Sequence, residues 1–253
     1  MKPIIFNGSY IGRRNTGIGV VAKSLISNLS PDKVTFLDPL GLRRESSIAI
    51  PSNLSPEHGF NAHLRRLYWI QTQLPQLVSR YKGDLLFSPL PEAPLLSNVR
   101  TVVLAHDIIP LRFLAPNLLS SYFLTYIPFV LHNAKLILCN SLATAKELKK
   151  YYSIPANKLH PIKLGYNDSE FYSLNLAREN FFLVLGRHNP HKNLERIIRA
   201  FSFAKINDYK LIFVGPFDRR YTSRLMKIIE KLNLSHLCEW KGWIDDDEKL
   251  LLL

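Results

Sequence analysis

The sequence predicts an α/β fold of two domains, each built on a parallel sheet covered by helices. Short runs rich in β-branched and aromatic residues alternate with longer segments of helical period, and such alternation is typical of parallel sheets. The alternation breaks off once, over residues 165–180, and then starts again. A length of 253 residues with 47% hydrophobic residues is enough for one large or two small domains with a sizeable core.

In the first part of the chain, strands and helices are predicted in turn. The predicted strands span residues 3–6, 34–37, 84–88, 101–105, 135–139 and 158–163. The predicted helices span residues 18–29, 60–80, 116–132 and 142–152. We expect Ser141 to be the N-cap of the last of these helices, because its hydroxyl can accept a hydrogen bond from a free backbone N–H of the first turn.

The interruption at residues 165–180 is polar and has no periodicity, which suits a connection between domains. After it, strands are predicted at 181–185, 211–214 and 237–240, and helices at 194–206 and 219–232. The acidic residues 245–248 are typical of the first turn of a helix, of which 249–253 supply only one or two turns. We therefore predict a first domain over residues 1–165, a linker over 166–180 and a partial second domain over 181–253.

Composition excludes several classes of protein. The hydrophobic share excludes a disordered or collagen-like chain, and two cysteines, Cys139 and Cys238, are too few for a zinc cluster or a disulfide framework. The apolar run 3–6 is far shorter than the hydrophobic region of a signal peptide, and no stretch reaches the roughly 18 apolar residues of a membrane span. We expect a cytoplasmic protein, either soluble or bound at the inner face of the membrane.

The net charge of +13 is unevenly placed along the chain. Residues 1–165 hold 19 basic and 8 acidic side chains, whereas residues 166–253 hold 14 and 12. The first part contains the basic pairs Arg13-Arg14, Arg43-Arg44, Arg65-Arg66 and Lys149-Lys150. These pairs are either solvated surface charge or a surface that attracts anionic lipid, diphosphate or nucleic acid, and none extends into the longer basic run of a nucleic-acid patch.

The first candidate motif is Thr16-Gly17-Ile18-Gly19, which follows the first predicted strand and opens a helix. Glycines at this place let backbone N–H groups approach an anion at the helix N-terminus. The motif is not a full G-x-G-x-x-G pattern, so a plain tight turn explains it equally well.

The second candidate is His106-Asp107, directly after the apolar run 101–105. The carboxyl ends of parallel strands are where α/β sheets place their ligands, which makes this position a candidate site. The alternative interpretation is a loop histidine tied to a nearby carbonyl.

The third candidate is the loop 186–193, which again follows a strand and opens a helix. Arg187 offers a planar fork of donors and Lys192 a point charge, and the helix N-terminus adds a partial positive charge, so the loop suits a diphosphate. A metal site at His188 and His191 is a poor alternative, because a third ligand is not nearby in the sequence.

These motifs in this order resemble the retaining GT-B glycosyltransferases of group 1 (family 4) type, which include mannosyl- and glucosyltransferases of polysaccharide assembly. The resemblance runs along nearly the whole chain and implies two Rossmann-like doubly wound domains. It rests on residues 16–19, 103–110, 138–148 and 158–165 in the first domain and on residues 184–194, 211–215 and 241–244 in the second.

The resemblance implies transfer of a hexosyl group from a nucleoside-diphosphate sugar to a glycan or polyprenyl-linked acceptor, with retained configuration and without a metal or other cofactor. The donor would be held mainly by the second domain, the acceptor by the first, and the reaction would take place in the cleft between them. Arg187 and Lys192 would stabilise the departing diphosphate, and the backbone at Gly17 and Gly186 would also contact the donor. His106 would orient the reacting sugar or the acceptor hydroxyl.

The resemblance also implies a further helix, a strand and a glycine-rich segment containing Glu beyond residues 242–244, and the sequence stops before them. A doubly wound sheet has the strand order 3-2-1-4-5-6, and the second domain would contain only strands 1 to 3. Strand 1, residues 181–185, would therefore present an unpaired apolar edge that invites aggregation or a partner. A second hypothesis is therefore a truncated, non-catalytic chain, or one half of a two-chain enzyme completed by a second chain. A third hypothesis, nucleic-acid binding, rests on net charge alone, and we expect no nucleic-acid partner.

Overall fold

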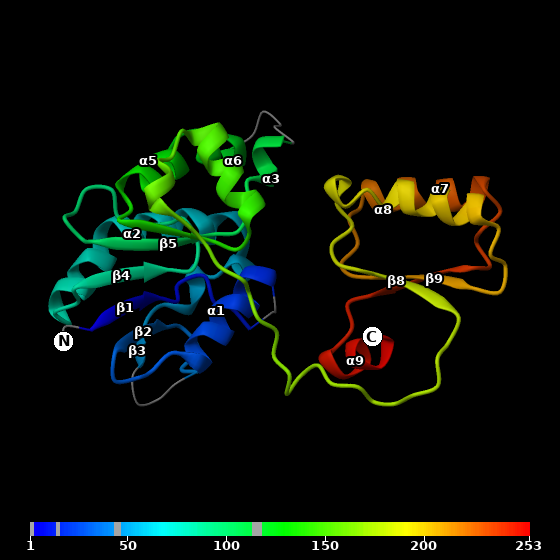
Figure 1. Cartoon of the computed structure of the whole chain (residues 1–253), viewed down its shortest axis with the longest axis horizontal. Helices are drawn as coiled ribbons and strands as arrows, with labels where there is room; N and C mark the ends of the chain where they lie inside the picture. Colours follow the sequence, from blue (N-terminus) through cyan, green and yellow to red (C-terminus); the bar gives the residue numbers. More distant parts are fainter. Residues whose placement is uncertain (1–2, 14–15, 43–46, 113–117) are drawn as a thin grey trace. The chain divides into compact units, whose positions relative to one another are not determined.

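A computed structural model of the chain describes residues 3–13, 16–42, 47–112 and 118–253. Among the basic pairs, Arg14, Arg43 and Arg44 lie outside the described residues. By contacts within the chain, the structure divides into two compact units, Met1–Gly165 and Tyr166–Leu253 (Figure 1). No helix of the described part is both long enough and apolar enough to cross a membrane.

Unit 1 is built on a seven-stranded sheet in the order β3-β2-β1-β4-β5-β6-β7, and every neighbouring pair is parallel. The strands are β1 (Ile4–Asn7), β2 (Val34–Asp38), β3 (Ser47–Ala49), β4 (Leu85–Ser88), β5 (Thr101–Ala105), β6 (Leu136–Cys139) and β7 (Leu159–Pro161). Strand order reverses at β1, since β2 lies on one side of it and β4 on the other. This reversal is the doubly wound arrangement that the sequence predicts.

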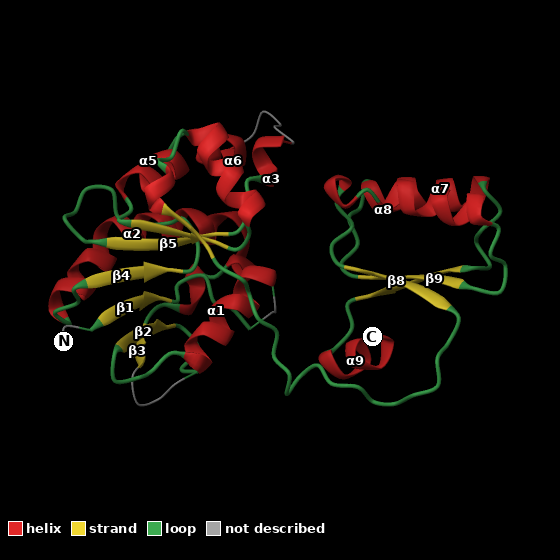
Figure 2. Ribbon diagram, in the orientation of Figure 1, coloured by secondary structure: helices red, strands yellow, loops and turns green. Residues whose placement is uncertain are grey.

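Helices cover both faces of this sheet (Figure 2). They are α1 (Gly17–Asn28), α2 (Gly59–Arg80), α3 (Ile109–Arg112), α4 (Leu118–Leu124), α5 (Tyr126–Asn133) and α6 (Leu142–Tyr152), with short 3-10 turns at Ser52–Leu54, Pro56–His58 and Ala156–Lys158. Because neighbours in a strand point to opposite faces, Phe6 packs with the α1 residue Ile26, whereas Ile5 packs with Trp69 and Ile70 of α2. The core of unit 1 therefore lies on both sides of β1.

Unit 2 holds a three-stranded parallel sheet in the order β10-β9-β8, formed by β8 (Phe181–Leu185), β9 (Lys210–Val214) and β10 (Cys238–Gly242). Helices α7 (Leu194–Ala204) and α8 (Tyr221–Lys231) cover one face, and α9 (Asp246–Leu252) lies on the other face (Figure 1). A 3-10 turn, Pro190–Lys192, precedes α7. Within residues 166–253, all of which are described, β8 pairs with β9 alone, so the predicted edge strand is confirmed.

Local sequence explains where several helices begin. The Ser141 hydroxyl accepts a hydrogen bond from the backbone N–H of Thr144 at 3.0 Å, which confirms Ser141 as the N-cap of α6. Asp245 caps α9 in the same way, accepting from the N–H of Glu248 at 2.7 Å. The prediction of a single helix over 116–132 is wrong in one respect. The described part of this segment forms two helices, α4 and α5, that meet at Thr125.

Candidate functional site

The carboxyl ends of the parallel strands of unit 1 meet at one edge of its sheet. The segment after β1, the Pro89–Pro94 loop after β4, His106 after β5 and Asn140 after β6 all lie at this edge, since neighbouring strands run in the same direction. Ligands of doubly wound sheets bind at such edges, next to the strand where the order reverses. The edge at β1, β4 and β5 is therefore the candidate site of unit 1.

His106 is fixed at this edge by its neighbours. Its Nε2 lies 2.8 Å from the backbone carbonyl of Pro89, at the end of the adjacent strand, and the ring N–H donates to that carbonyl. Its own backbone carbonyl accepts a hydrogen bond from the Thr144 hydroxyl at 3.0 Å, which joins it to α6. The first of these contacts is the one expected for a loop histidine tied to a carbonyl.

The contact with Pro89 also decides which nitrogen of His106 can accept a hydrogen bond. Burial lowers the pKa of His106, although its hydrogen bond to Pro89 and the carboxylate of Asp107 act in the opposite direction. A neutral ring that donates through Nε2 carries its lone pair on Nδ1. His106 can thus accept a hydrogen bond from a hydroxyl through Nδ1 while the protein holds the other side of the ring.

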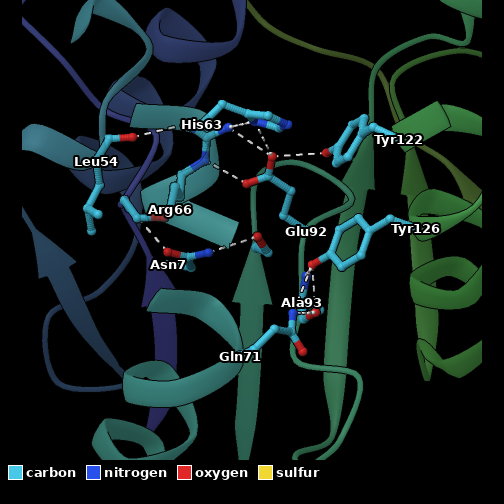
Figure 3. Close-up of polar contacts among 11 residues, drawn as sticks. Asn7, Leu54, His63, Arg66, Gln71, Glu92, Ala93, Tyr122 and Tyr126 are labelled. Atoms are coloured by element: carbon cyan, nitrogen blue, oxygen red, sulfur yellow. Dashed lines mark hydrogen bonds and ion pairs between the residues drawn. The ribbon is translucent and has the colours of Figure 1, made fainter. Parts of the chain in front are cut away.

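The Pro89–Pro94 loop that holds His106 is itself held by a buried ion pair between α2 and the loop (Figure 3). The Arg66 guanidinium donates to both carboxylate oxygens of Glu92, from Nε to Oε2 at 2.7 Å and from Nη2 to Oε1 at 2.9 Å. The side chains of Arg66 and Glu92 are 3% and 1% exposed. Arg66 Nη1 also donates to the carbonyl of Leu54 at 3.0 Å. A bidentate pair of this kind fixes the relative orientation of the two side chains in addition to stabilising their charges.

Two tyrosines complete the support of the loop (Figure 3). The Tyr122 hydroxyl donates to Glu92 Oε1 at 2.9 Å, and the Tyr126 hydroxyl donates to the carbonyl of Ala93 at 2.8 Å. Burial alone would raise the pKa of Glu92, but the charge and hydrogen bonds of Arg66, together with His63 and Tyr122, outweigh burial and hold the pKa below its usual range. Glu92 therefore stays ionised. Through Arg66, Tyr122 and Tyr126, the Pro89–Pro94 loop is anchored to the helices α2, α4 and α5.

Sequence reasoning missed Arg66 and Glu92. The Arg65-Arg66 pair was expected at the surface, and this expectation is wrong for Arg66, which is buried, and correct for Arg65, which is exposed. A signal was present in the helical spacing: Arg66 lies four residues after Ala62 and four before Ile70, both buried on the core face of α2. A charged residue in that register needs a buried partner of opposite charge.

Gly17 is the first residue of α1, at the same edge of unit 1. Thr16 is the N-cap, and its hydroxyl accepts from the N–H of Gly19 at 3.1 Å. A Cβ placed on Gly17 would meet no heavy atom of the described residues within 4 Å beyond its own helix and chain neighbours, whereas a Cβ on Gly19 would lie 3.0 Å from the Thr16 hydroxyl oxygen. Gly19 thus makes room for the cap, and open space adjoins Gly17.

The candidate site of unit 2 is the loop from Gly186 to Asn193, between β8 and α7. Gly186 has φ +135°, a conformation that favours glycine, and its carbonyl lies 2.0 Å from the position that a Cβ on Gly215 would take. The two strand ends therefore meet backbone to backbone. Beyond them, the side chains of Arg187, before the turn that leads into α7, and of Lys192, the last residue of that turn, are exposed.

The two histidines of this loop do not share an environment. His188 is 1% exposed and lies edge-on to Phe213 and Trp240, with Nδ1 3.1 Å from the Thr222 hydroxyl. Burial lowers its pKa. Among the described residues, no group of three or more His, Cys, Asp or Glu side chains could hold a metal ion. His188 is thus a core residue that packs the loop against β9 and β10.

Comparison with known proteins assigns the chain to a family. The family described as Glycosyltransferase Family 4 matches residues 16–170, more than half of the chain, and the family described as Glycosyl transferases group 1 matches residues 168–253. The chain belongs to the group 1, family 4 glycosyltransferases. The candidate residues Gly17 and His106 fall within the first match, and the Gly186–Asn193 loop falls within the second.

Individual relatives agree with this assignment. The O-antigen chain mannosyltransferase RfbU of Salmonella typhimurium is 27% identical over 168 residues, which cover 66% of this chain and 45% of RfbU. The chain thus spans less than half of the length of this curated relative. Among solved structures, sucrose-phosphate synthase of Thermosynechococcus elongatus has a TM-score of 0.68 at 16% identity, over 100% of this chain and 73% of that one.

A further solved structure, Anabaena HepE in complex with UDP and glucose, has a TM-score of 0.69 at 17% identity, over 99% of this chain and 72% of that one. Likeness at this level of identity shows the fold, and the fold is GT-B, as the sequence predicts. The described units thus contain the predicted site residues in two groups: Gly17 and His106 at the carboxyl edge of the sheet of unit 1, and Gly186, Arg187 and Lys192 at or after the carboxyl end of β8 in unit 2.

Proposed function

We propose that this glycosyltransferase moves a hexosyl group, of mannosyl or glucosyl type, from a nucleoside-diphosphate sugar to a glycan or polyprenyl-linked acceptor. The observation that carries the proposal is the Gly186–Asn193 loop, which presents Arg187 and Lys192 to solvent at the start of α7. RfbU is named as an O-antigen chain mannosyltransferase, which supports polysaccharide biosynthesis as the setting. The structures of HepE hold UDP or UDP-glucose, which supports a nucleotide sugar as the donor class.

In the proposed reaction, the bond between the sugar C1 and the diphosphate oxygen breaks while a bond forms between C1 and the acceptor hydroxyl oxygen, and the proton of that hydroxyl passes to the departing diphosphate. Negative charge grows on the departing diphosphate, and Arg187 and Lys192 are assigned to stabilise it. The backbone N–H at Gly17, where α1 begins, is assigned to the donor as well, since it lies at a helix N-terminus. The N–H of Gly186 already donates to the Val214 carbonyl at 2.8 Å, so Gly186 is assigned to the donor only through the course of its backbone into the loop. In this proposal the positive charges of Arg187 and Lys192 take the place of a metal ion at the diphosphate, so transfer does not require a metal. Measuring activity in excess EDTA tests that part.

His106 is assigned to orient a hydroxyl of the donor sugar or of the acceptor. Its Nε2 is occupied by Pro89, so Nδ1 is the nitrogen that accepts from such a hydroxyl. The acceptor side of the reaction belongs to unit 1 in this proposal, and a polyprenyl diphosphate acceptor would bring that unit to the inner face of the membrane. Retention of configuration at C1 is the stereochemical outcome that we propose, and the anomeric coupling of the product in ¹H NMR tests it.

Calorimetric titration of GDP- and UDP-sugars into the 253-residue chain tests the donor assignment. Arg187→Ala and Lys192→Ala should each weaken binding of the preferred donor about tenfold to a hundredfold, because each removes a charge-assisted contact worth roughly 1.5–3 kcal/mol. Lys210→Ala is the matched control, since Lys210 is exposed at the opposite end of the same sheet. Equal heats from the wild type and both variants would refute the phosphate assignment.

A second candidate function is one half of a two-chain glycosyltransferase. It is favoured by β8, an edge strand whose side chains Phe182 and Leu185 are about half exposed. A groove of about 1400 Å³ also lies between residues 171–179, β8 and α9, and Leu250–Leu253 form one of its walls. Under this candidate the chain binds donor or acceptor but transfers sugar only with a partner, so full transfer by the isolated chain would exclude it.

A further inference from the structure

The outer surface of α7 and α8 carries a dense group of cations that the sequence analysis did not single out. A groove of about 480 Å³ runs between the two helices of unit 2. Its lining holds six cationic side chains, from Arg199, Arg219, Arg220, Arg224, Lys227 and Lys231. Glu195 is the one carboxylate among these lining residues, and it pairs with Arg199 and Arg224 at 2.9 Å each. We call this surface the α7–α8 cationic face.

The cations form a row because of helical spacing. Arg220, Arg224, Lys227 and Lys231 follow one another at intervals of four, three and four residues, which places them on one side of α8. The row is about 16 Å long at 1.5 Å per residue. It is therefore longer than a single phosphate group and suits a succession of phosphates.

The neighbouring helix α7 carries an exposed aromatic side chain. Phe203 of α7 is 90% exposed and lies one turn beyond Arg199, on the same side of that helix. Phe203 therefore supplies a large apolar group on the side of α7 that bears Arg199. A basic helical face with a protruding Phe is typical of surfaces that lie in the headgroup region of a bilayer.

An acidic segment of unit 2 lies on the other side of its sheet. Four consecutive acidic residues, 245–248, form the N-cap and first turn of α9, which lies on the face opposite to α7 and α8 (Figure 1). The near-neutral total of residues 166–253 thus includes a cationic groove on one face of the sheet and an acidic helix start on the other. A planar anionic surface would favour approach by the cationic face.

We propose that the α7–α8 cationic face docks on an anionic lipid surface, with the cations of α8 on lipid phosphates and Phe203 inserted between headgroups. Charge complementarity with an extended plane of phosphates, together with Phe203, selects a membrane as the occupant. No residue of the Gly186–Asn193 loop lines this groove, and the proposal does not depend on the proposed transfer reaction. From the sequence, basic surface charge was instead expected on residues 1–165.

Flotation with vesicles of phosphatidylcholine containing 30% phosphatidylglycerol tests the proposal, with pure phosphatidylcholine vesicles as the neutral reference. The triple variant Arg220→Glu/Lys227→Glu/Lys231→Glu should lower the partition coefficient on anionic vesicles about a hundredfold, at roughly one kcal/mol per cation removed. The control is Lys146→Glu/Lys149→Glu/Lys150→Glu, which makes the same charge change at three exposed positions of α6. It should change the coefficient less than about threefold.

Phe203→Ala separates insertion from charge attraction. It should weaken vesicle binding about tenfold, from the loss of one buried aromatic side chain, whereas Phe129→Ala, at a 63% exposed position of α5, should have no effect. Circular dichroism confirms that each variant is folded.

Three results would overturn the proposal. The first is a triple variant that binds vesicles as the wild type does, or that loses no more than its α6 control. The second is soluble glycerol 1-phosphate bound as tightly as the vesicles, which would indicate a small-phosphate site. The third is saturable binding of a short oligonucleotide without vesicle binding, which would indicate a nucleic-acid surface.

Discussion

At the scale of single residues, the buried pair of Arg66 and Glu92 is the feature that most directly links the core of unit 1 to its candidate site. Removing one partner leaves the other as an unpaired buried charge. We expect Glu92→Gln to lower the free energy of unfolding by roughly 3–5 kcal/mol. Replacing both by apolar residues of similar size, as in Arg66→Met/Glu92→Leu, should cost much less, because no unpaired charge remains.

Urea unfolding followed by circular dichroism measures both variants. The exposed pair of Arg100 and Asp84 is the matched control, and Asp84→Asn should change stability by less than about 1 kcal/mol. If the double variant is as unstable as Glu92→Gln, the pair contributes to the free energy of unfolding through more than the pairing of its charges. The position of the Pro89–Pro94 loop can be followed separately, because His106 donates to Pro89 and its ring signals should shift in Glu92→Gln.

The residues of the candidate site differ in how far the sequence reveals them. His106, Arg187 and Lys192 each follow a predicted strand, and the ligand edge of a parallel sheet is a property of topology that a sequence can carry. The hydrogen-bond partner of His106 could not be predicted from the sequence. Pro89 and His106 are 17 residues apart and meet only because β4 and β5 pair in register, which no local pattern encodes.

At the scale of elements, two glycines at strand and helix ends are expected to respond differently to alanine. A Cβ on Gly215 would lie 2.0 Å from the carbonyl oxygen of Gly186, at a backbone φ of +143°, so Gly215→Ala should destabilise unit 2 by about 3 kcal/mol or more. A Cβ on Gly17 meets no heavy atom within 4 Å in the part of the chain that the structure describes, so Gly17→Ala should leave stability within about 0.5 kcal/mol of the wild type.

The same two variants test the role proposed for the α1 N-terminus. If the donor approaches the backbone at Gly17, Gly17→Ala should weaken nucleotide-sugar binding about tenfold despite its unchanged stability. Thermal unfolding and calorimetry of the two variants give both quantities. A Gly17→Ala chain that binds donor as the wild type does would remove Gly17 from the site, and a stable Gly215→Ala chain would contradict the close approach of the strand ends.

Elements with a strong period were predictable, and elements decided by tertiary contacts were not. The apolar run of β5 and the amphipathic α2 both lie where the pattern places them. The three-residue strand β3 was missed, because so short a strand has no period and exists by pairing with β2. The division of one predicted helix into α4 and α5 follows from Pro128 near the start of α5, which has no N–H to continue the hydrogen bonds of a preceding helix.

At the scale of the whole molecule, acid should weaken both units through histidines that are buried or half-buried. The pKa values of His63 and His106 in unit 1, and of His188 in unit 2, are all lowered by burial. The unfolded chain therefore binds more protons than the folded chain once the pH falls below the ordinary histidine value of about 6.5. Stability contributed by the neutral rings is present above that pH and is lost as the pH falls toward the folded pKa values.

We therefore expect the free energy of unfolding to decrease as the pH is lowered from 7.5 to 5.5, by up to about 1.4 kcal/mol per pH unit for each histidine involved, and the urea midpoint to fall with it. Glu92 does not contribute in this range, because its lowered pKa keeps it ionised until more acidic pH. His188→Phe should remove part of the dependence, since a phenyl ring can occupy the aromatic surroundings of His188 without a proton to gain. His236→Gln, at an exposed position of the same unit, is the control and should keep the full dependence. A midpoint that stays constant from pH 7.5 to pH 5.5 would show that these rings protonate as easily in the folded chain as in the unfolded one.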